Sequence, residues 1–332
     1  MFLFIAAIVI GLVLLVWSAD RFVDGAVGVA QFFGMSTFLI GMLVVGFGTS
    51  APEMVVSILS ALNDTPQLAL GNAYGSNIAN IALILGANAV IAPVVVKKHA
   101  MFRDIPILVF MTVLTIILVK DGNVSFMDGL VLLLAFVAVT ALNILLEFKA
   151  RRERKKAEKL DSDIPEEKVS IFKSLLWLFV GLGILILSSR MLVWGAIGMA
   201  QALGVSDLLI GLTIVAVGTS LPELASSIAA ARKGENDLAV GNVIGSNFFN
   251  TLVVVGIAAV ISPIKSMDPA VLSRDLPIMS ALTLLLFFIC IPLKKSNRYN
   301  KTDKYGFGRL AGILFLLLYV GYLVLLGLNA TA

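Results

Sequence analysis

The chain has 332 residues, of which 59% are hydrophobic and 14% are charged, and its mean hydropathy is +1.00. This composition excludes a soluble domain of that length and indicates a polytopic membrane protein. The net charge of +4 does not indicate nucleic-acid binding, because the basic residues gather in loops between apolar segments. With one Cys, one His and no Gly-Lys-Ser/Thr motif, the sequence argues against a Cys/His metal centre, an internal disulfide and ATP-driven transport by this chain alone.

Ten apolar segments are long enough to cross a bilayer as helices. The first has no basic region and no small-residue cleavage site, so we expect a spanning helix there and no removable signal peptide. The segments lie at about 2–19, with a helix that continues towards Phe33, and at about 36–61, 66–92, 104–119, 126–148, 171–202, 206–231, 237–262, 275–293 and 307–328. The sequence therefore predicts an all-α fold of ten transmembrane helices.

A charged stretch at 149–170 divides these helices into two sets of five, a first repeat at 1–148 and a second at 171–332. The stretch is too short to bury a core of its own, and we expect a flexible, solvated linker. Because each repeat has an odd number of spans, the second must enter the membrane from the opposite side. This is the organisation of an inverted-topology repeat.

The basic residues predict which side of the membrane each loop occupies. In a ten-span arrangement, 20 of the 25 Lys and Arg residues fall on the side of the linker. Only Lys120, Lys265 and Arg274 fall in loops on the other side. The positive-inside rule then makes the linker cytoplasmic and both termini extracytoplasmic.

Two smaller features are expected to be structural. The sequence Arg103–Pro106 recurs as Arg274–Pro277, and in each copy the Asp is expected to cap a helix whose first turn tolerates Pro. His99 follows two Lys residues in a loop and is expected to be a solvated surface residue.

One polar motif occurs in both repeats. The sequence Gly48–Glu53 (Gly-Thr-Ser-Ala-Pro-Glu) recurs 170 residues later as Gly218–Glu223 (Gly-Thr-Ser-Leu-Pro-Glu). At the same offset, Gly71–Asn80 recurs as Gly241–Asn250, with Gly-Asn-x-x-Gly-Ser-Asn-x-x-Asn in both copies. The chain is therefore an internal duplication. Carboxylates, hydroxyls and amides within membrane-spanning segments are functional candidates by default.

The residue types of the motif suit a hard cation. Pro breaks or kinks a helix, and the carbonyl groups that it frees, expected near Gly46 and Ala216, are tolerated at membrane depth only where they line a cavity. Helical spacing places polar side chains on shared faces: Thr49 and Ser50 with Glu53, Thr219 and Ser220 with Glu223, Ser76 with Asn80, and Ser246 with Asn250. Such oxygen ligands suit Ca²⁺ or Na⁺ and do not suit Zn²⁺ or Cu⁺.

The number of carboxylates predicts exchange. Glu53 and Glu223 are the only acidic residues deep within the predicted spans, and together they neutralise one divalent or two monovalent cations. Two bare carboxylates at membrane depth repel each other, so a site that empties needs a competing cation or protons. Gly-rich helix packing with polar contacts between helices is the structural alternative, but it does not require a Glu beside a Pro break in both repeats. We interpret Asn72, Asn77, Asn242 and Asn247 as structural.

The paired motif resembles the α-repeats of the Ca²⁺/cation antiporter superfamily, and within it the prokaryotic sodium/calcium exchanger branch, along nearly the whole chain. The resemblance implies a plasma (inner) membrane exchanger in which spans 2, 3, 7 and 8 enclose the ion sites while spans 1 and 6 slide. It implies Ca²⁺ ligands at Glu53, Glu223 and the carbonyls of Thr49 and Thr219; Na⁺ ligands at Ser50, Ser220, Ser76, Ser246 and the carbonyls of Gly46 and Ala216; and a site closed by Asn80 and Asn250.

The expected function is secondary antiport of Ca²⁺ against Na⁺, with no cofactor and no evident protein partner besides the lipid bilayer. Ca²⁺/H⁺ exchange through protonation of the two Glu residues is an alternative. K⁺-dependent exchange is another, although some relatives, including K⁺-dependent ones, carry Asp where this chain has Asn250. An ion channel, which would conduct without coupling to a counter-ion, is a further alternative. An intramembrane enzyme would need a nucleophile and a base, and Ser50 with Glu53 lacks an evident oxyanion site.

Overall fold

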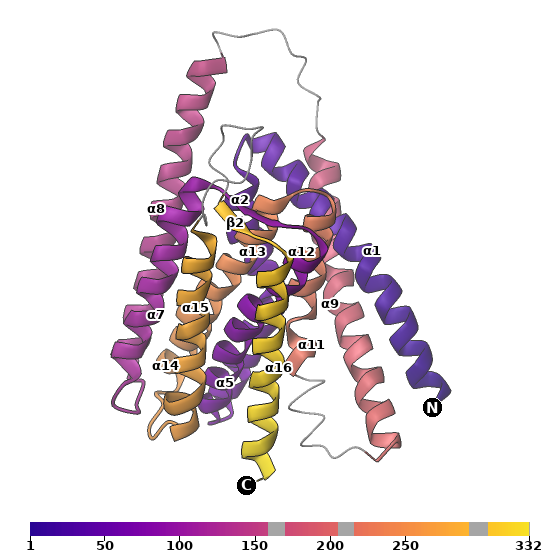
Figure 1. The fold of residues 1–332 in the computed structure, drawn as a ribbon, viewed down its shortest axis with the longest axis vertical. Coiled ribbons are helices and arrows are strands. Elements are labelled where there is room, and N and C mark those ends of the chain that lie inside the picture. The colour runs from indigo at the N-terminus through magenta and orange to yellow at the C-terminus, as the bar shows by residue number, and fades with distance from the viewer. Residues whose placement is uncertain (159–169, 205–215, 292–304, 332) are drawn as a thin grey trace.

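The computed structural model describes residues 1–158, 170–204, 216–291 and 305–331 (Figure 1). Half of the predicted linker (159–169) and the first part of the predicted seventh span lie outside these residues. Within them, eight uninterrupted helices and one bent pair are long and apolar enough to cross a membrane. These nine helices correspond to nine of the ten predicted spans, and α11 and α12 (Ala216–Thr219 and Leu221–Arg232) form the described part of the seventh.

The first repeat contains five spans. They are α1 (Phe2–Phe33); α2 (Thr37–Ile40), the π-helical turn η1 (Gly41–Val45), α3 (Gly46–Thr49) and α4 (Ala51–Leu62); α5 (Pro66–Ile78), η2 (Ala79–Leu85) and α6 (Gly86–Ile91); η3 (Ala100–Asp104) and α7 (Ile105–Val119); and α8 (Phe126–Glu158). The predicted extension of the first helix to Phe33 is confirmed. The helix ends at Phe33, and the C-cap residue Gly34 has a positive φ of 59°, which Gly adopts easily.

The second repeat follows the same order. Besides α11 and α12, it contains α9 (Ile171–Ala202); α13 (Asn236–Phe248), η5 (Phe249–Val254) and α14 (Val255–Ile261); η6 (Val271–Asp275) and α15 (Leu276–Cys290); and α16 (Arg309–Thr331). Two short antiparallel strands, β1 (Val94–Val96) and β2 (Tyr305–Phe307), are an addition to the predicted helical fold. Val94 pairs with Phe307, so the strands connect the two repeats.

Two predictions about helix ends were wrong. Helix α8 continues to Glu158, ten residues into the predicted flexible linker, because Lys, Arg, Ala and Glu are good helix formers and no Gly or Pro interrupts them. Asp104 and Asp275 are not caps. Their helices begin earlier, at Ala100 and Val271, so both Asp residues have helical backbones and their side chains make no cap hydrogen bond.

The two Asp side chains instead pair with the Arg residues that precede them. Asp104 accepts hydrogen bonds of 2.9 and 3.0 Å from Arg103, and Asp275 accepts bonds of 2.7 and 3.0 Å from Arg274. Burying a carboxylate is costly unless its charge is paired, and these two are buried. The duplicated Arg-Asp sequence therefore neutralises an acid at the start of two membrane helices.

Of the eight uninterrupted membrane helices, the third and eighth spans are the most buried, and the eighth packs against the second. Close backbone contact permits this packing, because a Cβ atom added at Gly245 would overlap the carbonyl oxygen of Met42, and one at Gly241 would overlap that of Phe38. Helices α1 and α9 pack along each other at one side of the bundle (Figure 1).

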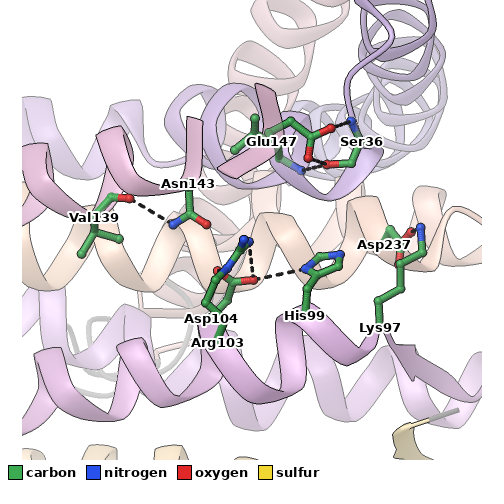
Figure 2. Close-up of polar contacts among 10 residues, drawn as sticks. Ser36, Lys97, His99, Arg103, Asp104, Val139, Asn143, Glu147 and Asp237 are labelled. Carbon is green, nitrogen blue, oxygen red and sulfur yellow. Dashed lines mark hydrogen bonds and ion pairs between the residues drawn. The ribbon is translucent and has the colours of Figure 1, made fainter. Parts of the chain in front are cut away.

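Two contacts between distant segments lie at the linker end of the molecule. Figure 2 shows Glu147 of α8 accepting hydrogen bonds of 2.8 and 2.9 Å from the backbone and hydroxyl of Ser36, the N-cap of α2. Lys97 forms an ion pair with Asp237 of α13. His99 is half-buried, 3.4 Å from Asp104, and lies edge-on to a Phe ring, so it is not the solvated residue that we expected.

Candidate ion-binding site

The second span bends at the duplicated motif. The helical segments on either side of Ser50 meet at an angle of 46°, and Ser50 itself has φ −85° and ψ 3°. Pro52 lacks the N–H group that would bond to the carbonyl of Gly48. Across the break, backbone hydrogen bonds join Ser50 N to the Gly46 carbonyl (3.0 Å) and Met54 N to the Ser50 carbonyl (3.2 Å). The Gly46 carbonyl is therefore already bonded, and only its second lone pair is available to a cation.

The second repeat has the same local geometry at Ser220, whose φ is −90° and ψ is 7°. Here Ser220 N bonds to the Val217 carbonyl at 3.1 Å, and Ser189 of α9 donates to the Gly218 carbonyl at 3.2 Å. Ala216 opens α11, directly after residues that lie outside the description. The sequence prediction of a helix break at each Pro is thus confirmed for the described parts of both repeats.

The other half of the motif also has matching structure in both repeats. Ser76 and Ser246 lie in the last turns of α5 and α13, and Asn80 and Asn250 are the second residues of the π-helical turns η2 and η5. A π-helical turn inserts an extra residue into a helix and often occurs at functional sites. In each repeat, therefore, the Ser lies in an α-helix and the Asn four residues later lies in a π-helical turn, so the predicted α-helical spacing does not hold between them.

The predicted ligands are buried, and many of their polar atoms have no protein partner. Thr49, Ser50, Ser220, Ser246, both Glu residues and both Asn residues are at most 1% exposed; Ser76 is 5% exposed and Thr219 is half-buried. Among described residues, the buried polar atoms without a hydrogen bond include Oε1 and Oε2 of Glu53, Oε2 of Glu223, Oγ of Ser220 and Ser246, both amide atoms of Asn80 and Oδ1 of Asn250. Such unpaired groups are rare in proteins, and this set is the oxygen-rich environment that a hard cation requires.

Hydrogen bonds join the motifs of the two repeats. Ser50 donates to Oε1 of Glu223 at 3.1 Å, whereas the sequence prediction placed Ser50 on a shared face with Glu53. The physical reason is the break itself, because Ser50 is not helical and the three-residue helical spacing does not hold across it. Thr49 lies 3.1 Å from the Val45 carbonyl and 3.3 Å from Oδ1 of Asn242, a residue of α13.

The sequence interpretation did not name Ser57, Ser226 and Ser227, and it interpreted Asn242, which contacts two of them, as structural. Asn242 Nδ2 lies within hydrogen-bonding distance of Ser226 (3.1 Å) and Ser227 (2.9 Å), and Ser57 donates to the Val254 carbonyl at 2.7 Å. The sequence does contain a signal for Ser226, because it lies three residues after Glu223 and therefore on the same face of a helix. Asn77, interpreted as structural, donates to Thr251 at 2.6 Å.

Comparison with known proteins agrees with this arrangement. A model of the sodium/calcium exchanger protein family matches residues 3–145 and 173–328. The chain belongs to the sodium/calcium exchanger family. It is 40% identical to CaxA from Alkalimonas amylolytica over 96% of this chain and 97% of that protein, and 40% identical to the inner membrane protein YrbG from Escherichia coli (strain K12) over 87% and 89%. A solved structure of the sodium-calcium exchanger NCX_Mj superposes with a TM-score of 0.78 and 32% identity, covering 96% of this chain and 97% of that one.

Family membership determines the class of activity. The chain is a cation/Ca²⁺ antiporter, and hence a transporter and not an enzyme. The fold of ten membrane helices in two inverted repeats agrees with the NCX_Mj structure. The oxygen-rich centre described above lies where the two duplicated motifs meet.

Proposed function

We propose that this exchanger carries Ca²⁺ against Na⁺ by alternating access, with the ions bound between the second, third, seventh and eighth spans. The observation that supports this most strongly is the group of unpaired, buried oxygen atoms on Glu53, Glu223, Ser220, Ser246 and Asn250. Carboxylate, hydroxyl and amide oxygens are ligands for Ca²⁺ and Na⁺. The relative MaX1 from Methanosarcina acetivorans, 29% identical over 96% of this chain, is named a sodium/calcium exchanger.

In this proposal ten of the twelve predicted site residues divide between two kinds of site, and the other two close the site. Ca²⁺ is held by the carboxylates of Glu53 and Glu223 and the carbonyls of Thr49 and Thr219. Na⁺ ions are held by Ser50, Ser220, Ser76, Ser246 and the carbonyls of Gly46 and Ala216, while Asn80 and Asn250 close the site. Because the two carboxylates neutralise one Ca²⁺ or two Na⁺, the ions compete for the same negative charge and exchange follows.

We propose that α1 and α9 slide to give alternating access. At the linker end these two helices pack against the rest of the bundle. A cluster of buried apolar residues there joins α1 and α9 to α12 and α13, and includes Phe22, Val23, Leu178, Ala230 and Leu238. Lys233 reinforces it by bonding to Asp24 at 2.6 Å and to the backbone carbonyl of Asp20 at 2.7 Å. We propose that these contacts close the linker side in this conformation and separate when α1 and α9 slide.

The orientation and the domain division are part of the same proposal. We place the chain in a prokaryotic plasma (inner) membrane, with residues 149–170 cytoplasmic and both termini extracytoplasmic. Residues 1–148 and 171–332 act as the two repeats. The distribution of basic residues supports this orientation.

Flux measurements in reconstituted vesicles test the coupling ion. Purified protein is reconstituted into vesicles loaded with Na⁺, and Ca²⁺ uptake is followed after dilution into Na⁺-free buffer. We expect uptake to follow the outward Na⁺ gradient and to persist with a protonophore. Uptake driven by a pH gradient without Na⁺ would favour Ca²⁺/H⁺ exchange, which the unpaired Glu carboxylates also permit. Ca²⁺ flux without any counter-ion gradient would contradict antiport.

A further inference from the structure

Asn242 contacts Thr49 at the first helix break and two Ser residues of α12, the helix that follows the second break. Its Oδ1 is 3.3 Å from the hydroxyl of Thr49 in the first break, and its Nδ2 is 3.1 Å from Ser226 Oγ and 2.9 Å from Ser227 Oγ, both in α12. Ser226 in turn donates to the backbone carbonyl of Glu223 at 3.1 Å. All five residues are at most 1% exposed.

The direction of these hydrogen bonds fixes the orientation of the amide. Ser226 uses its only proton on the Glu223 carbonyl, so it accepts a hydrogen bond from Asn242. The NH₂ group of Asn242 must therefore face α12, and its carbonyl oxygen faces Thr49. The Thr49 hydroxyl has one proton and shares it between two acceptors, the Val45 carbonyl at 3.1 Å and Oδ1 of Asn242 at 3.3 Å.

We infer that Asn242 is a positioning residue that holds Thr49 of the first repeat at a set distance from the helical turn carrying Glu223. The inference rests on the proposed function, in which both residues bind the same Ca²⁺. Asn242 acts through Thr49 and Ser226, and it is not itself a ligand in this arrangement. A cation that takes ligands from both repeats at once is bound well only if the two breaks keep their spacing, and selectivity among such cations depends on cavity size and rigidity.

Among the described residues, the first repeat lacks the equivalent connection, and one difference in sequence accompanies this. The residue that matches Asn242 is Asn72, but Val56 stands at the position of Ser226. Ser57, which matches Ser227, donates instead to the Val254 carbonyl. Among described residues, Asn72 Nδ2 is buried without a hydrogen-bond partner. The chain thus supplies a matched control, because the same motif residue makes no comparable side-chain contact within the described part of the chain.

The test compares Asn242→Ala with Asn72→Ala in the vesicle assay. For Asn242→Ala we expect the KM for Ca²⁺ to rise about tenfold, from lost neutral hydrogen bonds, with the maximal rate changing less than about threefold. Discrimination between Ca²⁺ and the larger Sr²⁺ should weaken, because the spacing of the two breaks is no longer held. Asn72→Ala should change the KM for Ca²⁺ less than about twofold.

A double-mutant cycle with Thr49→Val tests the connection itself. The two substitutions should be non-additive in KM, because either one removes the contact between Thr49 and Asn242. If Asn242→Ala does not reach the membrane, Ser226→Ala carries the test, since it removes one partner and leaves the amide in place. We expect it to raise the KM for Ca²⁺ severalfold and to weaken Ca²⁺/Sr²⁺ discrimination.

Several results would overturn the inference. An unchanged KM for Ca²⁺ and an unchanged Ca²⁺/Sr²⁺ ratio in Asn242→Ala or Ser226→Ala would do so, as would a loss of maximal rate alone, which indicates a purely structural role. An equal effect of Asn72→Ala would also contradict it. Failure of the wild-type chain to exchange Ca²⁺ for Na⁺ would instead reject the proposed function, so the two failures are distinguishable.

Discussion

The hydroxyl of Ser50 donates a hydrogen bond of 3.1 Å to Oε1 of Glu223, so the motif of one repeat binds the carboxylate of the other. The reciprocal pair is different, because Ser220 Oγ and both oxygens of Glu53 have no hydrogen-bond partner among the described residues. Two motifs of nearly the same sequence therefore have different environments in this conformation. Each carboxylate nevertheless keeps at least one oxygen available for a cation.

The first prediction concerns the two carboxylates. Glu53→Gln and Glu223→Gln should each reduce Na⁺-driven Ca²⁺ flux at least about a hundredfold, because an amide of similar size removes one of the two negative charges that balance Ca²⁺ at membrane depth. Flux in reconstituted vesicles is the measurement, and elution of a monodisperse protein from size exclusion is the control for folding. Ca²⁺ exchange at the wild-type rate in either variant would show that the site is elsewhere.

The second prediction is that exchange does not require K⁺. Ca²⁺ with K⁺ carries a charge of +3, whereas the site offers two carboxylates and the neutral Asn250. An uncompensated charge at this depth costs roughly 2.5–3.5 kcal/mol, enough to disfavour co-transport about a hundredfold. Na⁺-driven Ca²⁺ flux should be equal with K⁺ or with choline, and Asn250→Asp should gain sensitivity to K⁺. Strict dependence on K⁺ in the unmutated chain would mean that another acidic group contributes, and Asp20 and Asp24 are the first to examine.

The third prediction uses two glycines that occupy the same position of the motif. A Cβ atom at Gly245 would overlap the Met42 backbone, whereas one at Gly75 would meet no atom within 4 Å. Gly245→Ala should therefore lower the free energy of unfolding by roughly 1–3 kcal/mol, while Gly75→Ala should leave it unchanged or raise it slightly. Thermal unfolding in detergent measures the difference. Equal stability of the two variants would contradict the close packing of the second and eighth spans.

The fourth prediction concerns orientation. A cysteine at Glu158, introduced after replacement of the buried Cys290, should not react with a membrane-impermeant thiol reagent in intact cells and should react after the cells are opened. A cysteine at the exposed Lys120, in the loop between α7 and α8, should react in intact cells. The reverse pattern would place the linker outside the cytoplasm and invert the proposed topology.

The sequence alone determined the class of protein, the duplicated motif and the chemical type of its ligands. These follow from local rules: apolar segments of spanning length, Pro breaks within them, and oxygen-bearing side chains that recur at a fixed offset. Spacing on a helix also predicted which residues share a face, but only where the helix is continuous. At Ser50 it is not, and the hydroxyl expected beside Glu53 contacts Glu223.

Only the tertiary structure decided how the two repeats differ. Gly245 packs on a neighbouring backbone while Gly75 is open, and Asn242 connects two breaks while Asn72 connects none among the described residues. The motif is the same in each case, and the neighbours come from segments far away in the chain. The structure also decided where this helix begins: it starts at Ala100, so the buried Asp104 pairs with its neighbour Arg103 and does not cap the helix. For Gly245 and for the contact between Asn242 and Thr49, long-range packing sets the neighbours, and local sequence rules do not predict them.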